Sequence, residues 1–222
     1  MHSPFHDRRD AGEVLAHRLA HHGEKFDLII ALPRGGVEVA FPIAKELDLP
    51  LDLLIVKKLG APGQPELAIG AIASGGYAYI NYQLCRKLGI SQHEVTAIRF
   101  AATKDLIARE KRLLREKSTH SWFDKRILIV DDGIATGATI EVAIRAINAQ
   151  RPQSISVAVP VAALSAIEVL HRRIDHIYAL QTPSILGAVG QFYEEFPPVS
   201  EEAVSMMIDQ LERRSHDLAT RS

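Results

Sequence analysis

The sequence predicts an α/β fold with a doubly wound, mainly parallel sheet flanked by helices. Short apolar runs of strand length alternate along the chain with longer segments of helical periodicity. Most of these runs are apolar throughout, which is typical of strands buried on both faces of a parallel sheet. Two of the runs are followed directly by glycine-bearing turns, at Gly35-Gly36 and at Gly133–Gly137. Such turns should lie on one edge of the sheet, where ligands of these folds bind.

The individual elements follow from apolar runs, helical periodicity and turn residues. The expected strands are Phe26–Leu32, Leu51–Val56, one or two short strands in Ala68–Ile80, Arg126–Val130, Ser154–Val161 and His176–Leu180. The expected helices are Asp10–His22, Val37–Leu47, Tyr82–Leu88, Ser91–Glu116, Thr136–Gln150, Leu164–His171 and Ser200–Arg214. Gly60–Glu66 holds two glycines and two prolines, and we expect it to be an exposed loop.

Length and composition limit the number of domains, the kinds of partner and the location that can be expected. With 222 residues, we expect one domain over residues 1–222, with a small variable hood. The 26 basic and 27 acidic residues nearly balance, so no nucleic-acid partner is expected. The single cysteine, Cys85, excludes an intrachain disulfide and is expected to be buried. Without an N-terminal apolar region or a run near the ~20 residues of a membrane span, a cytoplasmic protein is expected.

The segment Ile127–Thr139 contains the strongest chemical signal. A buried strand ends in two carboxylates, Asp131 and Asp132, and a turn of small residues then opens a helix. A helix N-terminus binds phosphate well, and hydroxyls of Thr136 and Thr139 can donate to it. The carboxylates suit hydroxyl groups one sugar-width away, or a divalent cation. The pattern therefore indicates a ribose 5-phosphate site; the alternative is that the two acids merely end the strand and cap the helix.

Ile127–Thr139 resembles the binding motif for 5-phosphoribosyl-1-pyrophosphate (PRPP) of type I phosphoribosyltransferases: apolar strand, two acids, short spacer, T-G-small-T. The resemblance covers roughly Phe5 to Val204. Within it, Pro62, Gly63, Pro65 and Glu66, followed by Gly70, resemble a group of poorly characterised bacterial phosphoribosyltransferase-like proteins. The resemblance implies that Asp131 and Asp132 hold the ribose hydroxyls. It also implies that the substrate is bound by a further set of small and hydroxyl residues: Gly35, Gly36, Gly133, Ala135, Thr136, Gly137, Ala138 and Thr139.

Other segments resemble further parts of the family's site. Leu32–Gly36 is similar to its pyrophosphate loop, in which Arg34 would donate to phosphate oxygens and the Pro33–Arg34 peptide bond would be cis. Lys57-Lys58 resembles a basic pair of some members; one lysine would face pyrophosphate, and the sequence leaves open which. Gly60–Glu66 stands where the family has a mobile catalytic loop.

The implied reaction displaces pyrophosphate from PRPP by a nitrogen nucleophile of a small-molecule acceptor. Mg²⁺ would be the cofactor, held by Asp131 and Asp132 indirectly through PRPP and water. Ala135 stands where hypoxanthine-guanine enzymes have an aspartate base, which argues against a 6-oxopurine handled in that way. Two functions stay open: a catalytic transferase, or a PRPP-binding regulator of nucleotide metabolism without catalysis. A homodimer and no membrane partner are expected.

Weaker candidates are each open to two interpretations. Phe192 and Tyr193 could stack on a nucleobase, or pack a C-terminal segment. His17 and His21 have the spacing of metal ligands on a helix, but no third ligand is evident. The basic run Arg109–Arg115 could be a solvated helix face, or could reach pyrophosphate across a dimer interface or contact RNA.

Overall fold

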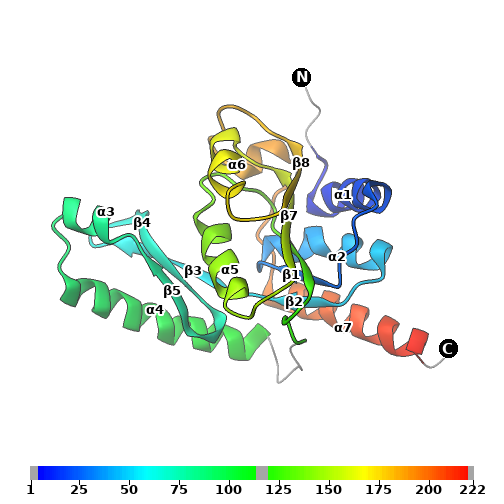
Figure 1. Ribbon diagram of the computed structural model, residues 1–222, viewed down its shortest axis with the longest axis horizontal. Helices are drawn as coiled ribbons and strands as arrows, with labels where there is room; N and C mark the ends of the chain where they lie inside the picture. The colour runs from blue at the N-terminus through cyan, green and yellow to red at the C-terminus, as the bar shows by residue number, and fades with distance from the viewer. Residues whose placement is uncertain (1–4, 114–119, 220–222) are drawn as a thin grey trace. The chain divides into compact units, whose positions relative to one another are not determined.

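The computed structural model of the protein describes residues 5–113 and 120–219 (Figure 1). The chain divides into two compact units that interleave in sequence. Unit 1 comprises Met1–Leu53, Thr119–Gly137 and Arg151–Ser222, and unit 2 comprises Leu54–Ser118 and Ala138–Gln150. The expectation of one domain over residues 1–222 stays a prediction.

Unit 1 is built on a five-stranded sheet in which every neighbouring pair is parallel. The strand order is β2-β1-β6-β7-β8, and the strands are β1 (Leu28–Ala31), β2 (Leu51–Leu53), β6 (Arg126–Val130), β7 (Ser154–Val161) and β8 (His176–Gln181). All four residues of β1 are buried, as are four of the five in β6 and seven of the eight in β7. The predicted parallel, doubly wound sheet is confirmed.

The helices of unit 1 cover both faces of this sheet (Figure 1). They are α1 (Arg8–His22), α2 (Gly35–Leu47), α6 (Leu164–Leu170) and α7 (Glu201–Ala219), with a short 3₁₀ turn, η2, at Val189–Phe192. α1 packs on α2, and α7 packs on α2 in turn. The side chain of Asp7 caps α1 by accepting from Asp10 N–H at 2.8 Å, and Gly23 ends that helix at φ 76°.

Unit 2 contains a three-stranded antiparallel sheet in the order β3-β4-β5. Its elements are β3 (Val56–Ala61), β4 (Gln64–Ala73), η1 (Ser74–Gly76), β5 (Tyr77–Ile80), α3 (Tyr82–Lys87), α4 (Gln92–Leu113) and α5 (Ala138–Asn148). Both α4 and α5 contact this sheet. Cys85 is buried in α3, as expected. Among the described helices of either unit, none is long and apolar enough to cross a membrane.

Two expectations for this region are wrong. Gly60–Glu66 is not a loop: Gly60 and Ala61 end β3, Gln64 starts β4, and only Pro62-Gly63 form the turn. Gly63 takes φ 71°, which suits the proline-glycine order of a tight turn. The expected strand Leu51–Val56 is also divided, because β2 ends at Leu53 and β3 begins at Val56 in the other unit.

Candidate functional site

Two loops meet where the order of the parallel sheet reverses. Leu32–Gly36 follows β1, and Asp131–Gly137 follows β6. β1 and β6 are neighbours, and the chain then continues to β2 on one side and to β7 on the other. Leu32 N–H donates to the Val130 carbonyl at 3.0 Å, which joins the loops at their base. Such a switch point is the usual ligand crevice of open α/β sheets. The expectation that both loops share one edge is confirmed.

The first loop turns the chain directly into a helix. The Pro33–Arg34 peptide bond is cis, as the family resemblance implies. α2 begins at Gly35, so the loop presents the positive end of a helix dipole. Arg34 is exposed, and within residues 5–113 and 120–219 its guanidinium has no hydrogen bond or ion pair. Its donors are therefore available to an anionic ligand at this helix terminus.

Both glycines of this loop are required by the second loop. A Cβ on Gly35 would lie 2.0 Å from Asp132 Oδ2, and one on Gly36 would lie 2.9 Å from Asp131 Cα. Contacts this short do not occur for real side chains on an unshifted backbone. The two glycines thus allow the loops to touch, which brings the arginine loop and the acidic pair into one site.

The two carboxylates are half-buried at the end of β6. Asp132 N–H donates to Asp131 Oδ1 at 2.9 Å. Asp132 Oδ2 accepts from Arg8 Nε at 2.8 Å, and Arg8 is only 6% exposed. The chemistry of the pair fits a magnesium site, since Mg²⁺ favours one or two carboxylates together with substrate phosphates and water. Among the described residues no group of three metal-ligating side chains occurs, so protein atoms alone do not form a full cage there.

The turn after the carboxylates is made of small residues. A Cβ on Gly133 would lie 2.5 Å from a Val189 methyl, so that position is closely packed. Ala135 is half-buried, Thr136 is exposed, and Gly137 takes φ 76°, a conformation that favours glycine. The second stretch of unit 1 ends at Gly137, and Ala138 and Thr139 form the first turn of α5 in unit 2.

The two candidate lysines lie in unit 2 and differ in their contacts. They are adjacent in β3, so their side chains leave opposite faces of the strand. Lys57 forms an ion pair with Asp105 of α4, and the hydrogen bond from Lys57 lowers the pKa of that carboxyl. Lys58 is exposed and forms no ion pair with a described residue. Lys58 is thus the lysine that is available to a ligand.

Arg8 is a site residue that the sequence did not identify, and the contact of Tyr193 with the acidic pair was not predicted either. The Tyr193 hydroxyl donates to the Asp132 carbonyl at 2.6 Å, and its ring stacks on Phe196 with centroids 4.9 Å apart. Tyr193 is 6% exposed, so the packing interpretation of this residue is confirmed. Phe192 is half-buried against the hydrophobic cluster that Phe5, Ala11 and Tyr193 form. Burial, followed by the negative charge of Asp132, raises the pKa of Tyr193, which keeps its hydroxyl a donor.

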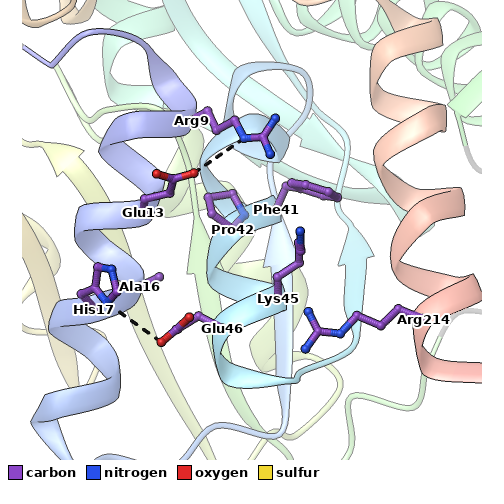
Figure 2. A pocket seen from close by; sticks show the side chains of 9 residues that line it. All are labelled: Arg9, Glu13, Ala16, His17, Phe41, Pro42, Lys45, Glu46 and Arg214. Atoms are coloured by element: carbon purple, nitrogen blue, oxygen red, sulfur yellow. Dashed lines mark ion pairs between the residues drawn. The ribbon is translucent and has the colours of Figure 1, made fainter. Parts of the chain in front are cut away.

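A separate pocket of unit 1, of about 360 Å³, is lined by α1, α2 and Arg214 of α7 (Figure 2). Both of its carboxylates have a basic neighbour within it: Arg9 Nε lies 3.7 Å from Glu13 Oε1, and His17 Nδ1 lies 3.9 Å from Glu46 Oε1. His17 thus faces a carboxylate, and the described residues hold no metal cluster around it. Lys111 and Arg112 of the basic run are exposed, and Arg115 lies outside the described residues.

The family model of the phosphoribosyl transferase domain matches residues 7–186. The chain belongs to the phosphoribosyl transferase family. Its sequence is 38% identical over 209 residues to "Putative phosphoribosyl transferase Rv0571c" of Mycobacterium tuberculosis strain H37Rv, and equally to MT0597 of strain CDC 1551. The match covers 94% of this chain and 47% of each relative. The chain thus spans about half the length of the curated relatives it matches.

Among solved structures, the phosphoribosyl transferase chain is similar to TT1426 from Thermus thermophilus. The TM-score is 0.79 at 35% sequence identity, and the alignment covers 94% of this chain and 99% of that one. TT1426 therefore shares the fold over nearly the whole described chain. The family match ends at residue 186, so Tyr193 and Phe196 lie beyond it.

Proposed function

We propose that the chain is a phosphoribosyltransferase that binds PRPP and Mg²⁺ and transfers phosphoribosyl to a nitrogenous, nucleobase-like acceptor, releasing pyrophosphate. One observation carries the proposal: a Cβ on Gly35 would lie 2.0 Å from Asp132 Oδ2. The arginine loop and the acidic pair are thus direct neighbours, as a ligand with a pyrophosphate next to a ribose diol requires. Membership of the family supports the same ligand.

The acidic pair would bind the ribose. When ionised, the carboxylates of Asp131 and Asp132 can only accept hydrogen bonds, and the two ribose hydroxyls can donate them. Hydrogen bonds from hydroxyls to carboxylates are charge-assisted and roughly twice as strong as neutral ones. Mg²⁺, when bound near these carboxylates through water and the diol, would offset the charge of the pyrophosphate and orient it. Fixed in this way, C1 of the ribose would lie beside the first loop.

Arg34 and the start of α2 would bind the pyrophosphate. The guanidinium presents a planar fork of donors, and the helix dipole adds positive potential at the same place. As the bond to C1 breaks, negative charge accumulates on the leaving pyrophosphate, and donors already in place stabilise it. From the contacts of the two lysines within unit 2, we assign Lys58 rather than Lys57 to this leaving group.

The turn after the acidic pair would bind the 5-phosphate. Hydroxyls of Thr136 and Thr139 can donate to phosphate oxygens, and Ala135, Gly137 and Ala138 leave room for backbone N–H groups to approach. Ala135 also places no carboxylate near the acceptor. An acceptor that needs an aspartate base at this position is therefore disfavoured. A cytoplasmic location and a homodimer stay predictions.

A panel of nucleobases with PRPP and Mg²⁺ tests this function, with pyrophosphate release as the readout. We expect turnover with at least one base. Asp124→Asn is a suitable control for site variants, because Asp124 is an exposed aspartate that precedes β6, at its other end. Tight PRPP binding without turnover on any base would instead support the regulator. No PRPP binding at all would overturn both functions.

A further inference from the structure

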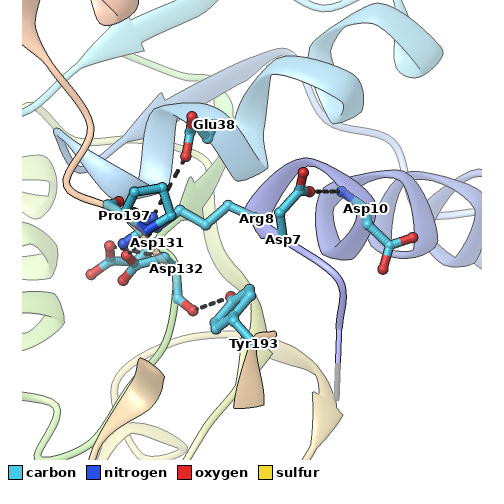
Figure 3. A network of polar contacts seen from close by, with 8 residues as sticks. All are labelled: Asp7, Arg8, Asp10, Glu38, Asp131, Asp132, Tyr193 and Pro197. Atoms are coloured by element: carbon cyan, nitrogen blue, oxygen red, sulfur yellow. Dashed lines mark hydrogen bonds and ion pairs between the residues drawn. The ribbon is translucent and has the colours of Figure 1, made fainter. Parts of the chain in front are cut away.

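Asp132 is held at three of its atoms (Figure 3). Its N–H donates to Asp131 Oδ1 at 2.9 Å, and its Oδ2 accepts from Arg8 Nε at 2.8 Å. Its carbonyl oxygen accepts from the Tyr193 hydroxyl at 2.6 Å. The side chain and the backbone of this residue are therefore fixed from separate directions. Within the described chain, the hydrogen bonds of the carboxylate use Oδ2, which leaves Oδ1 for a ligand.

Arg8 is itself immobilised. A terminal nitrogen of its guanidinium donates to the Pro197 carbonyl at 2.8 Å and lies 3.7 Å from Glu38 Oε2. The central carbon of the guanidinium lies 3.5 Å from the centre of the Phe196 ring. A cation over an aromatic face is attracted by the ring, more strongly when water is excluded. Arg8 thus reaches Asp132 with its Nε from a single, packed position.

Two segments far apart in the sequence bring these contacts together. Phe5 N–H donates to the Phe192 carbonyl and Glu194 N–H donates to the Phe5 carbonyl, both at 2.8 Å. Glu195 N–H donates to the His6 carbonyl at 2.8 Å as well. These bonds align the segment before α1 with the segment that carries Tyr193. Arg8, the first residue of α1, and Tyr193 consequently approach Asp132 from two segments that an isolated β-bridge between Phe5 and Tyr193 joins.

We propose that Arg8 and Tyr193 are positioning residues that fix Asp132 for a ribose hydroxyl, Arg8 through its carboxylate and Tyr193 through its backbone carbonyl. This rests on the proposed function, because it takes Asp132 to be a ligand of the ribose. Stability alone is a weak reason for the arrangement. A buried ion pair contributes little more than well-packed apolar residues of the same volume, whereas it does fix geometry. Tight positioning of a ligating side chain by its supporting contacts is what precise binding requires.

The test compares PRPP with inorganic pyrophosphate as ligands of the full chain, in the presence of Mg²⁺, by titration calorimetry. Arg8→Gln removes the charged donor. Pyrophosphate lacks the ribose, so in the proposed site its binding would depend mainly on Arg34 and, through Mg²⁺, only indirectly on Asp132. We expect PRPP affinity to fall about tenfold or more in this variant. The fold-loss of pyrophosphate affinity should be several times smaller. Arg8→Lys keeps the charge but cannot supply the same fork, and we expect an intermediate loss for PRPP.

Arg9→Gln is the matched control, because Arg9 is the next residue of the same helix and its side chain is 63% exposed. We expect both affinities of this control to stay unchanged. Equal losses for PRPP and pyrophosphate in Arg8→Gln would show that Arg8 acts through charge or stability, and would overturn the inference. Unchanged PRPP affinity would overturn it too. If the wild-type chain binds no PRPP, the proposed function fails first, which separates the two failures.

Tyr193→Phe keeps the proposal testable if Arg8→Gln does not fold. The variant removes one hydroxyl and keeps the ring that stacks on Phe196. Loss of one hydrogen bond to a loop carbonyl should weaken PRPP binding by a factor of about three to ten, again with less effect on pyrophosphate. If the ratio of PRPP affinity to pyrophosphate affinity is the same in Tyr193→Phe as in the wild type, the proposed role of Tyr193 is overturned.

Discussion

Gly35 and Asp132 lie so close that a methyl group on the glycine would be 2.0 Å from the carboxylate Oδ2. The same methyl would be 2.9 Å from Arg8 Nε. The loop after β1 and the loop after β6 therefore touch at this position, between a helix N-terminus and a carboxylate. Any side chain at position 35 has to displace one of them.

Gly35→Ala should accordingly damage binding more than folding. Overpacking of this kind costs typically about 1–3 kcal/mol of stability, and relief by movement of Asp132 would remove the proposed diol ligand. We expect PRPP binding to be lost while the protein stays folded at room temperature, as checked by calorimetry and circular dichroism. Gly187→Ala is the matched control, because a Cβ there meets only the end of Gln191, at 3.3 Å. Undiminished PRPP affinity in Gly35→Ala would contradict the contact.

The two lysines of β3 should differ in their effect on turnover. Because Lys57 is engaged by Asp105 and Lys58 is exposed, Lys58→Gln should lower the rate of pyrophosphate release by about tenfold or more, as for loss of one charged donor. Lys57→Gln should have a smaller effect on the rate. Steady-state assays at saturating PRPP make the comparison. The reverse order would assign the leaving group to Lys57.

Asp27 and Arg126 should stabilise the fold in a pH-dependent way. Arg126 binds both oxygens of the Asp27 carboxylate, at 2.7 and 3.0 Å, where β1 and β6 begin. The hydrogen bonds from Arg126 lower the pKa of Asp27 from 3.8 to about 2. The pKa of Asp27 is depressed in the folded state. The ion pair therefore contributes to stability above pH 3.8, and this contribution is lost as the pH falls through about 2.

Asp27→Asn should therefore lower the denaturant midpoint at neutral pH. The difference in midpoint between this variant and the wild type should shrink as the pH falls from 3.8 to about 2. Part of the ion pair is exposed, so solvent screening keeps the effect modest. Denaturant titrations across the acidic range provide the measurement, with Asp124→Asn as the control. A difference that does not change with pH would show that the ionised carboxylate is not what stabilises this end of the strands.

The parallel core could be predicted from the sequence because burial on both faces leaves a plain pattern. Arg126–Val130 and Ser154–Val161 are the strands of the structure to the residue, and each is an apolar run with a polar start. The loop expected at Gly60–Glu66 was wrong because proline and glycine mark tight hairpin turns and longer loops alike. The residues on either side, such as Lys57 and Lys58, lack the alternation that indicates strands.

Within the site, the residues on the two loops could be predicted from the sequence. The contacts by which Arg8 and Tyr193 hold Asp132 could not. Motif residues such as Asp132 are adjacent in sequence to the turns that display them. Arg8 is 124 positions from Asp132 and 189 from Pro197, so its role depends on tertiary contacts. An arginine near the start of a chain is also normally exposed, and nothing local indicates burial. The sequence allows packing as a role for Tyr193, but its bond to the Asp132 carbonyl depends on the fold.

In the proposed function, Asp131 and Asp132 bind the ribose of PRPP. Calorimetric titration of PRPP with Mg²⁺ into the wild type and into the double variant Asp131→Asn, Asp132→Asn tests it most directly, with Asp124→Asn as the control. We predict saturable binding to the wild type and to the control, and a loss of about a hundredfold or more in the double variant, as two charge-assisted hydrogen bonds are removed. Equal affinity in all three proteins would contradict the assignment.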